Sequence, residues 1–203
     1  MKLSFIVVAY NNPKALRTCL SSLVDQTYSP EEIEIIVCDN SQNFVLADEN
    51  KRLCDMSHRI RYEYTGNRTA IDLPHIRHKH CLYTATEIGV GLATGEWISV
   101  PNQDSYFAPV FAQRMLAVAD AEYTEFVYSD VVLGGPGHGY FALGTAPRSC
   151  GIDKTCFMLR REWFQGFKSK HDNYELADGF FVEELVTRGI KHSKCCELLV
   201  VHN

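Results

Sequence analysis

The first 40 residues alternate short apolar runs with a helical pattern of apolar positions. Residues Leu3–Ala9 (LSFIVVA) form a nearly continuous apolar run, which predicts a parallel strand buried on both faces. A helix is predicted next, with Asn12 as its N-cap and Pro13 in its first turn. Residues Ile33–Cys38 (IEIIVC) predict a second buried strand. This succession is a βαβ unit, so we expect parallel strands joined by a right-handed crossover.

The remaining chain continues the alternation of strands and helices. The predicted strands cover residues 60–64, 96–100, 125–132, 156–159 and 198–201, and the predicted helices cover residues 44–56, 83–93, 110–119 and 178–188. Residues 66–79 are polar and poorly patterned, which predicts a loop, and the glycine- and proline-rich residues 134–147 predict a mobile loop. There is no repeat and no domain break in the pattern. The predicted fold class is therefore α/β: a single domain with a mostly parallel central sheet flanked by helices on both faces.

Composition, charge and cysteine usage narrow the class of protein. The 203 residues suffice for one sizeable α/β domain, and 20 Lys and Arg against 25 Asp and Glu give a net charge of −5, which disfavours nucleic acid as a partner. No apolar run reaches the ~18 residues of a membrane span, and the apolar opening is too short for a signal peptide. The eight cysteines are scattered without a CxxC pair, so we expect free thiols and a cytoplasmic location rather than a disulfide framework.

Short polar groups follow three of the predicted buried strands. They are Tyr10–Asn11, Asp39–Asn40 and Asn102–Asp104. In a doubly wound sheet the carboxyl ends of such strands converge on one edge, where they form a crevice that suits a nucleotide. The alternative is that each group is only a turn or a helix cap, positions that Asn and Asp favour in any fold.

Neither of the common glycine-rich phosphate-binding motifs is present. The absence of GxGxxG and of GxxxxGK[ST] disfavours a dehydrogenase and a P-loop ATPase. A nucleotide diphosphate bound at this edge would therefore need a cation to balance its charge. The carboxylate of Asp104 is a suitable ligand for a divalent cation, Mn²⁺ or Mg²⁺.

The run HIRHKH contains His75, His78 and His80 and could suggest zinc. No cysteine or carboxylate is spaced to complete a tetrahedral site, so zinc is the weaker interpretation. We favour a loop that lends Arg77 or Lys79 to the phosphates of a donor.

Several segments together resemble the catalytic domain of glycosyltransferase family 2, whose members are inverting enzymes with a GT-A fold. The matching segments are SFIVVAYNN, SLVDQTY, EIIVCDN, ATGEWISVPNQDSYFAP and LADGFFVEELVTRGI, followed by VVHN. They occur in the order of the family and cover essentially the whole chain. The resemblance implies one GT-A domain over residues 1–203, with a nucleotide-binding half at about 1–105 and an acceptor and catalytic half at about 106–203.

The resemblance also implies which residues bind the donor. Ala9, Tyr10 and Asn11 would border the nucleotide, and Asp39 stands where the family uses an aspartate to hold the base or ribose. Gln103 and Asp104 occupy the later positions of the DxD motif, and Asp104 matches the carboxylate that binds the metal. Asn102 stands where a first aspartate is usual, which removes one charge from the site. His202 matches a position at which some members supply a second metal ligand; the alternative is a surface residue near the chain end.

A catalytic base is implied at the start of a late helix. Asp178 takes the place of the family's catalytic aspartate, and Ala177 stands where a glutamate is common. The base would take the proton of an acceptor hydroxyl as that hydroxyl attacks the anomeric carbon from the face opposite the leaving nucleotide. Asp178 could instead be an acidic residue that suits a helix N-terminus. Asp153 is the reserve candidate for a base or an acceptor contact.

The function that this resemblance implies is a metal-dependent inverting glycosyltransferase of the hexosyltransferase type. It would move a sugar from a nucleotide-diphosphate donor, a UDP-sugar by preference, to a hydroxyl of a glycan, a lipid-linked or a protein-linked acceptor. Asn102 and Ala177 keep open a catalytically impaired binding or scaffold module of the same fold. A nucleotidyltransferase would require a basic glycine-rich signature near the N-terminus, which is missing. The chain could also be a module of a longer multidomain protein.

Overall fold

The computed structural model describes residues 1–66, 74–135, 139–144, 146–164 and 177–203. The strands are β1 (Leu3–Ala9), β2 (Ile33–Asp39), β3 (Ile60–Tyr64), β4 (Trp97–Ser99), β5 (Ser105–Phe107), β6 (Phe126–Gly135), β7 (Gly139–Leu143), β8 (Phe157–Arg160) and β9 (His192–His202). The α-helices are α1 (Pro13–Val24), α2 (Phe44–Cys54), α3 (Pro74–Leu92), α4 (Phe111–Glu122) and α5 (Ala177–Thr187), and the short 3-10 helices are η1 (Pro30–Glu32), η2 (Lys154–Cys156) and η3 (Arg161–Trp163).

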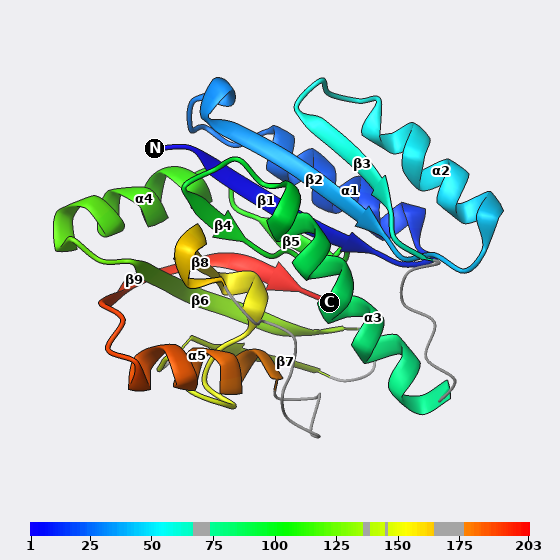
Figure 1. The fold of residues 1–203 in the computed structure, drawn as a ribbon. Coiled ribbons are helices and arrows are strands. Elements are labelled where there is room, and N and C mark those ends of the chain that lie inside the picture. Colours follow the sequence, from blue (N-terminus) through cyan, green and yellow to red (C-terminus); the bar gives the residue numbers. More distant parts are fainter. Residues whose placement is uncertain (67–73, 136–138, 145, 165–176) are drawn as a thin grey trace.

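The strands form one curled mixed sheet in the order β3-β2-β1-β4-β8-β6-β9-β5, with β7 added to β6 (Figure 1). β1, β2, β3, β4, β6 and β9 run in one direction, and β5, β7 and β8 run in the opposite direction. Helices lie on both faces of the sheet, with α3 in front of β1 and α1 behind it (Figure 1). The predicted α/β class with a mostly parallel sheet is therefore confirmed.

The side chains of β1 show why helices can cover both faces of the sheet. Every residue of β1 is buried. Phe5 packs on one face against Phe107 and Phe111, with ring centroids 6.0 and 6.2 Å away. Ile6 points to the other face, where α3 lies so close that a Cβ added to Gly89 would stand 2.3 Å from Ile6 Cγ2. The absence of a side chain at Gly89 thus allows α3 to lie close to β1.

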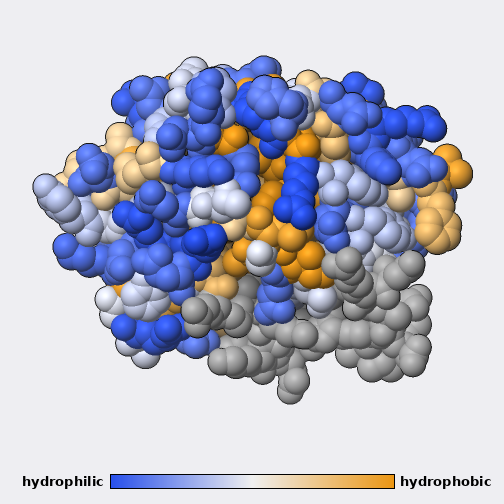
Figure 2. Space-filling view, turned by 45° about the horizontal axis from the view of Figure 1, so that its top comes forward, coloured by the Kyte–Doolittle hydropathy of each residue, from blue (hydrophilic) through white to orange (hydrophobic). Residues whose placement is uncertain are grey.

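Most large apolar side chains lie inside one continuous core. Figure 2 shows a face that is mainly hydrophilic, with hydrophobic residues gathered in a strip near its middle. The cysteines that the structure describes are free, as predicted, and most of them are buried. None of the helices in the described ranges combines the length and the apolar character needed to cross a lipid bilayer.

Several segments differ from the sequence predictions, among them β5, which the pattern did not predict. Residues 74–79, predicted as loop, form the first turns of α3. Their polar residues carry no apolar period, although Pro74 suits a first helical turn. The predicted loop at 134–147 contains the β6–β7 hairpin, in which Gly135 pairs with Gly139; residues 136–138 and 145 lie outside the described part. The last strand begins at His192 rather than at residue 198, and its pairing with β6 shifts register around Asp130.

Candidate active site

A pocket of about 250 Å³ lies at the carboxyl ends of β1, β2 and β4. Its lining residues are Val8, Tyr10, Asn40, Asn102, Gln103, Asp104 and His202. All three polar groups that the sequence placed after strands contribute to this lining, so the predicted convergence is observed. This is the edge at which open α/β sheets bind their ligands.

Gln103 joins the Asn102–Asp104 segment to the end of β1. Its side-chain Oε1 accepts the N–H of Tyr10 at 2.8 Å, and its Nε2 donates to the carbonyl oxygen of Tyr10 at 2.9 Å. Asn102 also forms an isolated parallel bridge with Val8. Because the amide of Gln103 is hydrogen-bonded to backbone, the contribution of this residue to the pocket is to hold Tyr10 and Asp104 side by side.

Asn11 performs a similar task toward β2. It adopts a left-handed backbone with φ of 46°, which Asn tolerates better than most residues. Its Oδ1 accepts the backbone N–H groups of Gln42 and Asn43, both at 3.2 Å, and its own N–H donates to Ser41 Oγ at 2.8 Å. Asn11 therefore fixes the segment after β2 beside the end of β1.

Asp39 is fully buried and is held by protein groups. Its carboxylate accepts the N–H of Ser41 at 2.8 Å, Asn50 Nδ2 at 3.1 Å and the hydroxyl of Tyr62 at 2.9 Å. The adjacent residue, Asn40, lines the pocket instead. Sequence reasoning did not identify Asn50 and Tyr62, because nothing in their spacing indicates that they face Asp39. The role of Asp39 toward a base or ribose stays a prediction.

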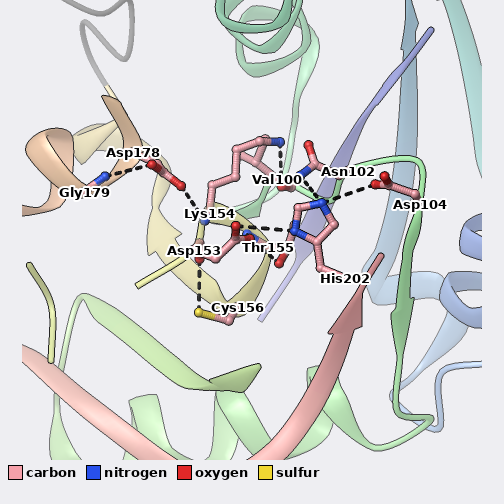
Figure 3. Close-up of polar contacts among 10 residues, drawn as sticks. All are labelled: Val100, Asn102, Asp104, Asp153, Lys154, Thr155, Cys156, Asp178, Gly179 and His202. Carbon is pink, nitrogen blue, oxygen red and sulfur yellow. Dashed lines mark hydrogen bonds and ion pairs between the residues drawn. The ribbon is translucent and has the colours of Figure 1, made fainter. Parts of the chain in front are cut away.

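Asp104 and His202 meet on the pocket wall (Figure 3). Asp104 Oδ1 lies 3.3 Å from His202 Nε2, and Asn102 Nδ2 lies 2.9 Å from the same nitrogen. The antiparallel pairing of β5 with β9 sets Ser105 opposite His202, which brings the last strand beside the Asn102–Asp104 segment. Both predicted metal ligands are thus neighbours in the fold.

Asp153 lies on the opposite side of the imidazole ring. Its Oδ2 is 3.4 Å from His202 Nδ1, and its Oδ1 accepts the N–H of Thr155 at 2.9 Å together with the Thr155 hydroxyl. Burial favours a lower pKa for His202, but its contacts with Asp104 and Asp153 outweigh burial and raise that pKa to about 9. Burial favours a higher pKa for Asp153, but the contacts with His202 and Thr155 outweigh it and lower that pKa to about 2.

Asp178 and Lys154 extend this group of charges toward α5 (Figure 3). Asp178 Oδ2 accepts the backbone N–H of Lys154 and its Oδ1 accepts that of Gly179, each at 3.0 Å. Burial, followed by repulsion from Asp153, raises the pKa of Asp178 to about 6.

Lys154 is a buried cation that sequence reasoning missed. The side chain is 3% exposed, and its Nζ donates to the carbonyl oxygen of Val100 at 3.4 Å. Burial lowers the pKa of Lys154, whereas Asp153, Asp178 and Asp104 favour its charged form. Lysine is rarely buried, so no local pattern could indicate this placement. Within the described part of the chain, Lys154 thus brings a basic group close enough to Asp153, Asp178 and Asp104 to interact with them electrostatically.

Comparison with known proteins decides the family. The family model described as "Glycosyl transferase family 2" matches residues 4–181. The chain belongs to glycosyltransferase family 2. The "Putative glycosyltransferase EpsH" of Bacillus subtilis is 29% identical to this chain over 119 residues. The aligned region covers 59% of the chain and 30% of EpsH. The chain thus spans less than a third of that relative.

Solved structures agree on the fold of this family 2 chain. TarS of S. aureus, crystallised with UDP, superposes with a TM-score of 0.73 at 15% identity and covers 99% of this chain and 60% of its own. The mannosyltransferase PcManGT of Pyrobaculum calidifontis, in complex with GDP-Man and Mn²⁺, superposes with a TM-score of 0.71 at 13% identity. The match covers 99% of this chain and 56% of PcManGT. The GT-A fold expected from the sequence is confirmed.

The residues of this family 2 site fit a divalent cation. Asp104 and His202 offer a carboxylate oxygen and an imidazole nitrogen on the pocket wall, with side chains 39% and 20% exposed. The carboxylate oxygen suits Mn²⁺ or Mg²⁺, and imidazole is a common ligand of divalent transition metals. Within the described part of the chain, no three or more His, Cys, Asp or Glu residues are grouped to hold a metal. A cation at Asp104 and His202 would therefore complete its coordination with oxygens of a ligand or of water.

The other predicted site residues are placed as follows. Ala9 ends β1 and is not among the described residues that line the pocket; its carbonyl oxygen accepts the N–H of Asn40 at 2.8 Å, and its role toward a nucleotide stays a prediction. Arg77 and Lys79 belong to α3, and their side chains, like those of the nearby histidines of the HIRHKH run, lie outside the described part of the structure. Ala177 is the first residue of α5, directly before Asp178.

Proposed function

We propose that this chain transfers a sugar from a nucleotide-diphosphate donor to an acceptor hydroxyl, with inversion at the anomeric carbon. The observation that carries the proposal is the meeting of Asp104 and His202 on the wall of a pocket at the carboxyl ends of β1, β2 and β4. A divalent cation, Mn²⁺ or Mg²⁺, would be held by these two side chains. When bound, it would neutralise the charge that develops on the departing diphosphate.

Tyr10, Asn40 and the Asn102–Asp104 segment would bind the nucleotide. Tyr10 supplies an aromatic side chain on the pocket wall, the kind of surface on which a nucleobase stacks. Gln103 holds Tyr10 and the metal-binding aspartate at a fixed separation through its two hydrogen bonds. The nucleotide complexes of the structural neighbours, with UDP for TarS and GDP-Man for PcManGT, support a nucleotide donor for this fold. We favour UDP.

Asp178 is the proposed catalytic base. Its pKa of about 6 leaves it mainly ionised at neutral pH yet basic enough to accept a proton from a hydroxyl. The N–H groups of Lys154 and Gly179 orient both of its oxygens. The acceptor oxygen forms a bond to the anomeric carbon, its proton passes to Asp178, and the bond between that carbon and the diphosphate oxygen breaks. Attack opposite the leaving group inverts the configuration, as in single-displacement glycosidases.

The test is a transfer assay with a panel of UDP- and GDP-sugars and glycan or lipid-linked acceptors, run with Mn²⁺ and with a chelator. We expect product only with the metal, and loss of turnover by about 10²–10⁴-fold in Asp178→Asn. Turnover that survives chelation contradicts the metal role. Binding of a nucleotide sugar without any transfer would instead support the second candidate, a binding module, which Asn102 in the DxD motif and Ala177 before Asp178 favour.

A further inference from the structure

We propose that Asp153 is a positioning residue that orients the imidazole of His202, so that Nε2 of His202 faces the cation site beside Asp104. The inference deepens the proposed function and rests on its cation site. It gives Asp153 a task different from that of a catalytic base, and it explains why a second buried carboxylate lies so near Asp178.

The two ring nitrogens of His202 face two different aspartates. Nε2 lies 3.3 Å from Asp104 Oδ1 on the pocket side, whereas Nδ1 lies 3.4 Å from Asp153 Oδ2 (Figure 3). Asp104 lines the pocket, and Asp153 is not among the described residues that line it. The ring therefore separates a carboxylate open to ligand from one behind it.

Asp153 is itself held in place. Its Oδ1 accepts both the N–H and the hydroxyl of Thr155, and it caps η2. Its side chain is 14% exposed, against 39% for Asp104. Only Oδ2 remains to interact with another group, and that oxygen faces His202. A carboxylate anchored in this way is poorly placed to meet an acceptor hydroxyl but well placed to fix a ring.

A histidine that binds a metal is commonly oriented by a carboxylate at its other ring nitrogen, and a small movement of the ring would turn the 3.4 Å approach of Nδ1 to Asp153 Oδ2 into such a hydrogen bond. An imidazole that binds a cation through Nε2 carries its proton on Nδ1, and a carboxylate that accepts this proton fixes the tautomer and the ring orientation. Asparagine at position 153 would present an Nδ2–H₂ donor to Nδ1. The ring would then carry its proton on Nε2, which cannot bind a cation.

The first experiment measures Mn²⁺ affinity in the presence of saturating UDP, from the electron paramagnetic resonance signal of free Mn²⁺. We expect Asp153→Asn to weaken Mn²⁺ binding by about 10–100-fold. Asp178→Asn changes another carboxylate of the same cluster, one for which no contact with His202 is described, and should leave Mn²⁺ affinity nearly unchanged while lowering transfer by about 10²–10⁴-fold. In the His202→Ala background, Asp153→Asn should have little further effect on Mn²⁺ affinity, because the two changes remove the same interaction.

The outcomes separate the inference from the proposed function. A wild-type chain that binds no Mn²⁺ contradicts the cation site itself. Wild-type binding that Asp153→Asn leaves unchanged, or effects of Asp153→Asn and His202→Ala that simply add, overturn the role of Asp153 alone.

A second readout needs no metal. Above pH 9, where the ring of His202 is neutral, ¹⁵N-edited imidazole NMR spectra should place the single ring proton on Nδ1 in the wild type and on Nε2 in Asp153→Asn, with the His202 signals assigned by their loss in His202→Ala. Circular dichroism and the thermal midpoint verify that each variant is folded. A proton signal that persists on Nδ1 in folded Asp153→Asn overturns the inference.

Discussion

The side-chain amide of Gln103 makes both of its hydrogen bonds to the backbone of Tyr10, at 2.8 and 2.9 Å. This pair of bonds fastens the end of β1 to the segment that carries Asp104, although the two residues are 93 positions apart in the chain. The wall of the pocket is therefore held together by an amide that needs both a donor and an acceptor.

Replacing Gln103 with Glu should destabilise the chain by roughly 1–2 kcal/mol, because the carboxylate still accepts from Tyr10 N–H but leaves the Tyr10 carbonyl facing another acceptor. Urea denaturation gives the stability, and titration with UDP should show weaker binding. Gln113→Glu is the matched control. Gln113 Oε1 accepts the exposed hydroxyl of Thr27, a bond that glutamate keeps, so its change should stay within about 0.5 kcal/mol. Equal losses of stability in the two variants would contradict a special role for the two hydrogen bonds between Gln103 and Tyr10.

The rate of transfer should depend on pH through Asp178. Because the base must be ionised and its pKa is raised to about 6, kcat/KM should be level above that pH and fall about tenfold per unit below it. A profile of kcat/KM from pH 5 to pH 8 at saturating Mn²⁺ provides the measurement. An acid limb that stays unchanged in Asp178→Asn would assign the limb to another group.

Lys154 should influence the pH below which kcat/KM falls. Its ammonium lies in the group of aspartates and favours the ionised form of Asp178, so Lys154→Met should raise the pKa of Asp178 and move the acid limb to higher pH. Lys194→Met is the control, because Lys194 pairs with Asp130 and should not move the limb. A limb that stays in place in folded Lys154→Met would show that the buried charge does not act on the base.

Two glycines of α3 should respond in opposite directions to alanine. A Cβ at Gly89 would stand 2.3 Å from Ile6 Cγ2, whereas a Cβ at Gly91 meets nothing within 4 Å. We expect Gly89→Ala to destabilise by about 1–3 kcal/mol through overpacking. Gly91→Ala should stabilise by about 0.5–1 kcal/mol, because alanine favours the helix. Thermal or urea unfolding measures both, and a stabilising Gly89→Ala would show that α3 can shift away from the sheet.

Strong local patterns explain what could be predicted from the sequence. The apolar run of β1 allowed one interpretation, and Asn12 does cap α1, its side chain accepting the N–H of Ala15 at 3.2 Å. The polar groups after β1, β2 and β4 were expected to converge, and residues from each line one pocket. These features follow from neighbours in sequence and from the handedness of βαβ units.

The remaining features depend on contacts between distant segments. Lys154 is buried because η2 packs against β4, β6 and β9, which no spacing around residue 154 reveals. Asp39 stays a predicted contact for a base or ribose, and its hydrogen bonds with Asn50 and Tyr62 are contacts that the sequence pattern does not reveal. The start of α3 was missed because the polar residues 75–80 have no apolar period, so pattern alone could not distinguish them from loop.

The pairing of β9 with β5 has a consequence for folding. Asn102 and His202 are 100 positions apart, so their meeting requires that the final strand has already entered the sheet. An ion that prefers this assembled arrangement would pull the docking equilibrium of that strand toward completion. Hydrogen exchange along β9 should therefore slow when manganese and nucleotide are added. Docking of this strand and binding of the metal would then be thermodynamically coupled.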